Sequence, residues 1–194
     1  MAAFARGKTL EPTTMDILIE ELANDGSVTS REKARTMKLA DGSTIVVFAE
    51  KNGKDTTAEY RKRIESMSGG ANAGKPPKGF DASPFDPAWQ SAIRTQTAVR
   101  KGDLVEVPYT IRSRDADTTG IARFSVDGEP ISASQRWEKT PPFVTAISSS
   151  IEYIARGGSL FAERLASEGK VDALVFRRGF RFTMQFSEWR TISP

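Results

Sequence analysis

The sequence contains no cysteine and no histidine. Without thiols the chain has no disulfide, no thiolate zinc site and no cysteine nucleophile. Without imidazole it lacks the commonest general base and the commonest transition-metal ligand of proteins. Serine–histidine and cysteine–histidine catalysis are therefore excluded. The remaining possibilities are carboxylate chemistry with a hard cation, lysine chemistry and a role without catalysis. The absence of both residue types favours a protein that is not an enzyme and needs no cofactor.

Long apolar runs are missing as well. No stretch reaches the roughly 18 consecutive apolar residues that a membrane-spanning helix requires. The N-terminal stretch 1–8 lacks the apolar core of a signal peptide. These absences predict a protein that no signal peptide directs to secretion, that has no membrane partner, and that works in the cytoplasm or in a virion.

Composition indicates a folded chain with a mild basic bias. Of the 194 residues, 38% are hydrophobic and 27% are charged, which is enough apolar material for one domain with its own core. The formal net charge is only +3. Proteins that bind polyanions by charge alone usually carry more, or gather it on one face. Charge by itself therefore does not identify a nucleic-acid-binding protein.

Five segments carry apolar residues at helical spacing, or capping signals, and are predicted to be helices. They are residues 13–24, 57–67, 86–101, 141–156 and 159–169. The strongest pattern is in 141–156, where Phe143, Ile147, Ile151 and Ile154 recur at helical intervals before a glycine pair.

Other segments are typical of strands. Asp41-Gly42 lies between two apolar runs and predicts a two-residue hairpin turn. The four consecutive apolar residues 45–48 predict a strand that is covered on both faces. Residues 104–112 alternate in polarity, and Pro108 within them indicates a sheet edge or a bulge. The predicted fold class is α+β, with a mixed or antiparallel sheet with hairpins, packed by four to five helices.

The C-terminal stretch 176–186 carries four phenylalanines and three arginines. Arg178, Gly179, Phe180 and Phe182 match part of the RNA-recognition octapeptide, but too few residues follow for the helix and strand that this fold requires. The alternation of phenylalanine and methionine with polar residues is typical of a half-buried strand. We therefore interpret the stretch as one bent strand or a tight hairpin of the core, whose opposite face can still contact phosphate.

Two further motifs fail at a required position. Residues 69–75 resemble a phosphate-binding loop, but Pro76 stands where a hydroxyl must hold magnesium. Asp115 and Asp117 open like a calcium loop, but Val126 occupies the position of the bidentate glutamate.

These observations lead to an organisation and a leading functional hypothesis. An N-terminal arm (1–12) precedes a single α+β domain (13–194), which contains an extended, ordered Gly/Pro-rich loop at 68–87. We expect a non-catalytic structural or assembly protein, repeated in a symmetric particle such as a virion, as a capsid, connector or tail component. Its partners would be copies of itself or other structural subunits. The residues expected at subunit contacts are Phe4, Lys75, Phe80 and Phe85.

Two alternatives stay open at this point. The first is a DNA- or RNA-binding protein that contacts phosphates from the sheet face and from the 57–67 helix. Its candidate residues are Arg61, Lys62, Arg63, Arg177, Arg178 and Arg181. The second is a small Mg²⁺-dependent enzyme centred on Asp115 and Asp117. No catalytic, cofactor-binding or metal-ligating residue is assigned under the leading hypothesis.

Overall fold

A computed structural model describes residues 10–68, 83–85, 87–114, 116–140, 142–156, 159–173 and 176–191. The strands are β1 (Leu10–Leu22), β2 (Val28–Lys38), β3 (Thr44–Lys51), β4 (Lys54–Asp55), β5 (Ile93–Thr95), β6 (Val99–Lys101), β7 (Leu104–Arg112), β8 (Asp117–Ser125), β9 (Pro130–Trp137), β10 (Val144–Arg156), β11 (Ser159–Ala173) and β12 (Phe176–Thr191). The helical elements are the α-helix α2 (Thr57–Ser68) and the short 3-10 helix η2 (Pro87–Ala92).

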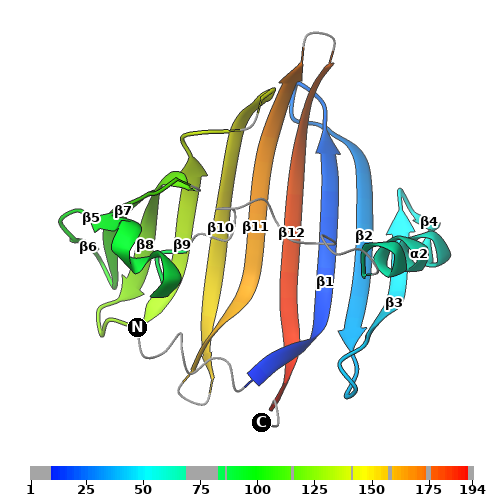
Figure 1. Cartoon of the computed structure of the whole chain (residues 1–194), viewed down its shortest axis with the longest axis horizontal. Coiled ribbons are helices and arrows are strands. Elements are labelled where there is room, and N and C mark those ends of the chain that lie inside the picture. The colour runs from blue at the N-terminus through cyan, green and yellow to red at the C-terminus, as the bar shows by residue number, and fades with distance from the viewer. Residues whose placement is uncertain are drawn as a thin grey trace.

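All the strands belong to one open, antiparallel sheet of 12 strands (Figure 1). Its order is β4-β3-β2-β1-β12-β11-β10-β9-β8-β7-β5, and β6 pairs with β7 beside β5. The first and last strands are therefore neighbours in the middle of the sheet. One meander, β1 to β4, runs from there to one edge, and the second, β5 to β12, runs back from the other edge.

The predicted α+β class is wrong. The described part of the chain is nearly all antiparallel strand, and it contains one α-helix rather than four or five. Of the predicted helices, only the one at 57–67 is found there as an α-helix, as α2. The predicted 86–101 helix is reduced to η2, followed by the short strands β5 and β6. The segments predicted as helices at 13–24, 141–156 and 159–169 form the strands β1, β10 and β11.

The β1 segment shows why the helical interpretation failed. Met15, Leu18, Ile19 and Leu22 fit a helical stripe, yet Met15, Ile17 and Ile19 fit a strand equally well. Ile17, which the helical stripe leaves out, is buried in the core. Pairing with β12 on one side and, from Thr14 onward, with β2 on the other decides between the two periods, because these neighbours satisfy most of the backbone of β1.

Strand β10 carried a local signal against helix. Its residues include Val144, Thr145, Ile147, Ile151 and Ile154, whose β-branched side chains favour strands. Three consecutive serines lie in its middle, and serine is a weak helix former. The composition of this segment therefore favours a strand, and the helical spacing of its isoleucines arose by chance.

One face of the sheet, called here the covered face, is apolar along its whole width. A single cross-strand row on this face joins nine strands through their registered partners. It consists of Ala49, Ala34, Ile17, Met184, Leu165, Ile151, Ala133, Ala122 and Val107. Burying apolar side chains of this kind is the main force that holds a helix against a sheet.

Two helical elements pack on the covered face, one towards each edge (Figure 1). Tyr60 and Ile64 of α2 pack over Ile17, Ala34 and neighbouring residues of β1 to β3. Around η2, a second cluster contains the side chains Phe85, Trp89, Tyr109, Ile111 and Phe124. The described core therefore consists of two clusters rather than one, and strands β9 to β11 lie between them.

Three hairpins share the same turn chemistry. The turns at Gly26, Gly42 and Gly128 each follow an aspartate, and each glycine has a positive φ, between 84° and 86°. The backbone bonds Leu39 N–H to Ser43 O and Gly42 N–H to Leu39 O show a three-residue loop, not the predicted two-residue turn. Only the glycine adopts the left-handed conformation, as in a type I turn followed by a bulge.

Two glycines in strands lie beneath aromatic side chains on the covered face. Gly120 is registered with Tyr109, and Gly169 with Phe180. A Cβ on Gly120 would lie 2.2 Å from Ser134 O and 2.6 Å from the Tyr109 ring. A Cβ on Gly169 would lie 2.2 Å from the Phe180 ring. Each glycine therefore makes room for the aromatic ring of the neighbouring strand.

We predict that Gly120→Ala destabilises the protein by about 1–3 kcal/mol, because the added methyl group overpacks the contact with Tyr109. Tyr109→Ala in the same chain removes the ring, so the two effects should not add in a double-mutant cycle measured by urea unfolding. The backbone contact with Ser134 remains and limits the rescue. Strict additivity of the two substitutions would contradict this packing.

Candidate interaction surfaces

The opposite face of the sheet, called here the uncovered face, is polar and carries cross-strand ion pairs. No described helix packs on it, since α2 and η2 both contact the covered face. The ion pairs Asp16–Arg35, Glu50–Lys33, Glu152–Arg164 and Glu106–Arg123 each join neighbouring strands on this face. Arg35 binds Asp16 through two bonds, of 2.6 and 2.9 Å.

Glu20 is the buried centre of this charge network. Its side chain is only 5% exposed, and it accepts bonds from Arg31 on β2 and Arg181 on β12. Arg181 also lies 3.6 Å from Glu168 on β11. The hydrogen bond from Arg31, and then that from Arg181, hold the pKa of Glu20 below its ordinary value of 4.5 against the opposing effect of burial. Glu20 thus joins three strands of the centre.

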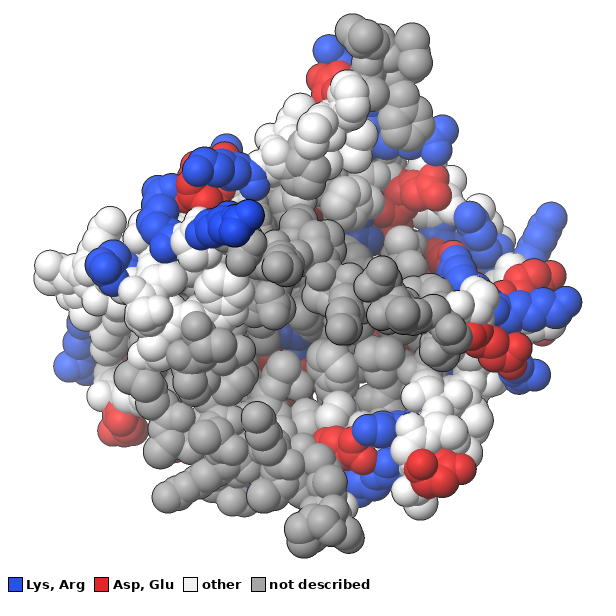
Figure 2. Space-filling model, in the orientation of Figure 1, with Lys and Arg blue, Asp and Glu red and all other residues white. Residues whose placement is uncertain are grey.

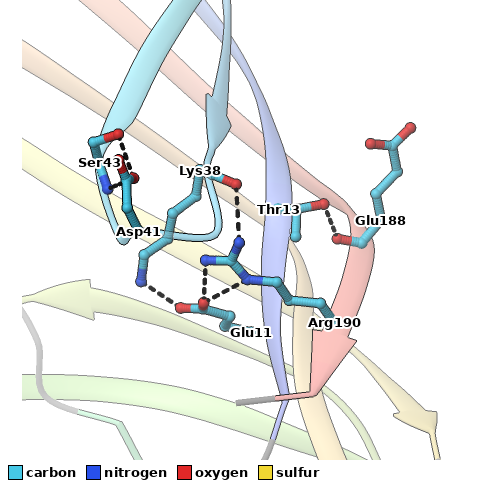
Figure 3. Close-up of polar contacts among 7 residues, drawn as sticks. All are labelled: Glu11, Thr13, Lys38, Asp41, Ser43, Glu188 and Arg190. Carbon is cyan, nitrogen blue, oxygen red and sulfur yellow. Dashed lines mark hydrogen bonds and ion pairs between the residues drawn. The ribbon is translucent and has the colours of Figure 1, made fainter. Parts of the chain in front are cut away.

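A second carboxylate holds together the ends of three strands (Figure 3). Glu11 at the start of β1 accepts two hydrogen bonds from Arg190 of β12, of 2.6 and 2.8 Å, and one from Lys38 of β2. These bonds lower the pKa of Glu11, with Lys38 the largest cause. Nearby, Thr13 donates a hydrogen bond to the backbone oxygen of Glu188, whose φ of 53° interrupts the regular pairing. The N- and C-terminal strands are therefore also fixed at this end.

The uncovered face also contains a shallow trough of about 710 Å³ across β8 to β12. The side chains that line it on this face are Thr119, Ile121, Ser134, Arg136, Ser148, Ser150, Arg164, Ala166, Glu168, Arg181 and Thr183. Hydroxyl groups and guanidinium groups dominate this list. The charged side chains in this list are three arginines and one glutamate, so positive charge exceeds negative charge in the trough.

The free edge of the sheet at β3 is apolar. The segment 45–48 was predicted to be covered on both faces, but the structure places it in the strand next to the two-residue edge strand β4. Ile45, Val47 and Phe48 are 43%, 46% and 39% exposed, while Val46 is buried. Consecutive apolar residues here mark an exposed edge and a bulge in the β2–β3 register, not a central strand.

The edge of β3 has backbone groups without strand partners. β4 pairs only with Glu50 and Lys51, and Ala49 bonds to Thr56 and Thr57. The carbonyl of Val46 receives only a 3.5 Å contact from the exposed side chain of Arg61. A groove of about 290 Å³ runs beside this edge, lined by Thr44, Ile45, Val46, Arg61, Ile64 and Glu65. An open apolar edge of this kind accepts an additional strand.

The basic residues predicted to contact nucleic acid do not form one surface. Arg61, Lys62 and Arg63 lie on α2, on the covered side, whereas Arg181 lies on the uncovered face of β12. Arg63 pairs with Glu32 and lies 4.4 Å from the centre of the Tyr60 ring.

The remaining predicted arginines, Arg177 and Arg178, lie at the start of β12, close to Arg181 in the same strand. They pair with Asp172 and Glu21, at 2.9 and 3.2 Å. Most of the predicted cations therefore have contacts within the chain, and the structure does not bring the α2 group and the β12 group together on one face.

Of the residues predicted at subunit contacts, only Phe85 is described. It is half-buried within the chain, where its ring makes edge-to-face contacts with Phe124 and Tyr153 at 5.5 and 5.2 Å. Phe4, Lys75 and Phe80 lie outside the described residues, as does most of the predicted 68–87 loop. The end of the predicted N-terminal arm, from Leu10 onward, belongs to β1.

The acidic pair predicted for a metal enzyme is only half described. Asp117 is at the start of β8 and pairs with Arg112 and Lys139, while Asp115 lies outside the described residues. In the part of the chain that the structure describes, no three acidic residues gather into a potential metal site. None of the described helices is both long and apolar enough to span a membrane.

Figure 2 shows the molecule from the side on which α2 lies. Lysine and arginine side chains alternate with aspartate and glutamate around the periphery of this view. No large patch of one charge occupies the described surface seen there. This distribution agrees with the many ion pairs within the chain.

Comparison with known proteins identifies no family. No family model matches the sequence, and no curated protein matches it. Two solved structures show a likeness: a complex of Pseudomonas aeruginosa MucA/MucB, and MucB in complex with MucA(peri). Each is 10% identical to this chain; the alignments cover 100% of it and 98% and 97% of the matched chains, with TM-scores of 0.26 and 0.24. Scores this low do not establish a shared fold, so no function follows from them.

We predict that Glu20→Gln lowers the free energy of unfolding by about 2 kcal/mol, because the buried carboxylate no longer balances Arg31 and Arg181. The matched control is Glu21→Gln, whose side chain is 43% exposed and pairs with Arg178. This control should cost less than about 0.5 kcal/mol. Urea unfolding of both variants measures the difference, and equal losses would contradict the central role of Glu20.

Acid should destabilise the protein through the same carboxylates. The pKa values of Glu11, Glu20 and Glu106 are all lowered in the folded state from 4.5 by basic neighbours. Their contribution to stability is therefore complete above about pH 4.5 and is lost as the pH falls through the lower folded-state values. We expect the melting temperature to drop over this acidic range, and to drop less in a Glu11→Gln, Glu20→Gln double variant. An equal drop in that variant would assign the acid sensitivity to other groups.

Proposed function

We propose that this chain is a non-catalytic structural protein that assembles with further copies of itself as a repeated subunit of a symmetric particle. A capsid, connector or tail subunit of a virion belongs to this class. The observation that carries the proposal is the open apolar edge of β3, where Ile45, Val47 and Phe48 are exposed along a strand that has no full-length partner on its outer side.

The scarcity of fully buried side chains supports the same proposal. Among the described residues, the largest side chains that are less than 2% exposed are Ile111 and Thr118. Association with other subunits would bury part of the surface that the sheet leaves exposed.

The β3 edge suits pairing with a second copy of itself. When two copies pair as antiparallel strands about a two-fold axis, each segment lies opposite the same segment of the other copy, which runs in the opposite direction. Residues 44–47 carry no charge, so no like charges would lie opposite each other. The other edge differs, because the strands β5 and β6 carry Arg94, Arg100 and Lys101. Self-pairing there would place cations together.

The groove beside β3 adds charge complementarity to this arrangement. Arg61 and Glu65 of α2 both line it. A two-fold axis normal to the sheet keeps both copies of α2 on the same side, so that Arg61 of one copy can face Glu65 of the other. Arg61 is exposed and contacts Val46 O only at 3.5 Å, so it is free to move away from the edge when a strand pairs there.

The test is the mass of the protein in solution, measured by sedimentation over a wide concentration range. We expect a self-associating species for the natural chain, and at least about a tenfold weaker association for Val47→Lys, since two cations would then meet at the edge. Val28→Lys is the matched control: Val28 is 42% exposed, but it lies at the start of β2, beyond the β2–β3 ladder and away from residues 44–48.

The melting temperature of each variant shows whether it is folded. A strict monomer at every concentration, or full association of the Val47→Lys variant, would remove the support for assembly through β3.

A further inference from the structure

The trough on the uncovered face is built from three neighbouring cross-strand rows. Its floor is a row of mostly small side chains that are registered with one another on five strands. These are Thr183, Ala166, Ser150, Ser134 and Ile121. The adjacent row forms one bank and consists of Arg181, Glu168, Ser148, Arg136 and Thr119. Arg164 and its partner Glu152 stand on the other bank.

The shape follows from side-chain length. Serine, alanine and threonine end close to the backbone, while the arginines of both banks extend well beyond it. The floor therefore runs across the strands, perpendicular to them. Neighbouring strands are about 4.8 Å apart, so five strands give a length of about 19 Å. An extended polypeptide advances about 3.3 Å per residue, and about six residues would span this length.

The floor offers hydrogen-bonding groups that the described chain does not use. The side-chain hydroxyl groups of Ser134, Ser150 and Thr183 form no hydrogen bond with any described residue. The same is true of the hydroxyl group of Ser148 on the bank. Each hydroxyl can both donate and accept. A row of such groups matches a peptide backbone, which presents N–H donors and C=O acceptors in turn.

The charges on the banks indicate which side chains such a peptide carries. Arg181 is balanced by Glu20 and Glu168, and Arg164 by Glu152. Arg136 is exposed and forms no ion pair with the described residues. It is therefore the unbalanced charge of the trough. A guanidinium group binds a carboxylate through two parallel hydrogen bonds.

We propose that the trough binds an extended, acidic segment of a partner polypeptide, about six residues long, with a carboxylate of that segment on Arg136. The proposal goes beyond assembly through β3, because no residue of β3 lines the trough. Two observations favour a polypeptide over a single-stranded nucleic acid. No aromatic side chain is among the described residues that line the trough, so the aromatic platforms on which successive bases usually stack are missing from that lining. Glu168 and Glu152 on the banks would also repel a continuous phosphate backbone.

The probe is the capped peptide acetyl-Gly-Asp-Ser-Glu-Gly-Asp-amide, added to the full-length protein and followed by isothermal titration and by amide chemical shifts. The neutral counterpart, with Asn and Gln in place of Asp and Glu, and a thymidine oligonucleotide of the same length are the comparison ligands. We expect binding of the acidic peptide, with shifts confined to β8–β12, and at least about tenfold weaker binding of the neutral peptide, since a charged hydrogen bond is lost.

Two variants and one control locate the site. Arg136→Gln should weaken the acidic peptide by about tenfold. Ser150→Leu places a large side chain on the floor and should abolish binding. Arg100→Gln, on the distant strand β6 where Arg100 contacts only the backbone oxygen of Gly102, should change nothing. Arg136→Gln affects an exposed side chain, so it remains informative even if Ser150→Leu does not fold.

Four outcomes would overturn the proposal: no binding of the acidic peptide, equal binding of the neutral peptide, unchanged binding by Arg136→Gln, or tighter binding of the oligonucleotide. The last would assign the trough to nucleic acid instead. Repeating the titration with the Val47→Lys variant separates this proposal from assembly, because that substitution changes the edge and leaves the trough intact.

Discussion

The pairing of β1 with β12 is the interaction on which the rest of the structure depends. It joins the first strand to the last along almost their entire lengths, from Leu10 opposite Thr191 to Leu22 opposite Gly179. One apolar cluster lies beneath α2 and the other around η2, and the α2 cluster also includes Phe182 and Met184 of β12. This packing and the central ladder, which Glu20 and Glu11 support, join the two meanders into one sheet. Residues so distant in sequence come together late in folding and at a high cost in loop-closure entropy. The regular register and the buried carboxylate at this junction compensate for that cost.

A sheet of this width has more surface than its helices can cover. The described helical elements pack towards the two edges of one face, and the other face must therefore be stable in water. Cross-strand ion pairs serve this purpose, because each arginine finds a carboxylate on the next strand and the face stays close to neutral. The open edge at β3 and the trough with Arg136 depart from this pattern, one through exposed apolar side chains and the other through an unbalanced charge. A partner gains most binding free energy at these two places, because it covers apolar side chains and pairs a charge that the chain itself leaves exposed.

Some of this structure could be predicted from the sequence and some could not. The alternation in β12 correctly placed Phe182 and Met184 on the apolar side and Arg181 and Thr183 on the other, because a long strand repeats its period many times. The Asp-Gly pairs were recognisable as turns, although their loops have three residues. Helices were wrongly predicted for β1, β10 and β11 because four or five apolar residues can fit both periods. The neighbouring strands then decide between helix and strand, and those strands can be nearly the full length of the chain away in sequence.

The candidate surfaces were harder to predict for the same reason. The floor of the trough consists of Thr183, Ala166, Ser150, Ser134 and Ile121. No sequence motif marks these residues, and they become neighbours only through the register of five strands. The run 45–48 gave a clear signal, but an apolar run fits a central strand and an exposed edge equally well. What separates these cases is the length of the strand beside it, here the two residues of β4. A strand without a full-length neighbour keeps its hydrogen-bonding capacity for another chain, and apolar side chains beside those groups favour a protein partner over water.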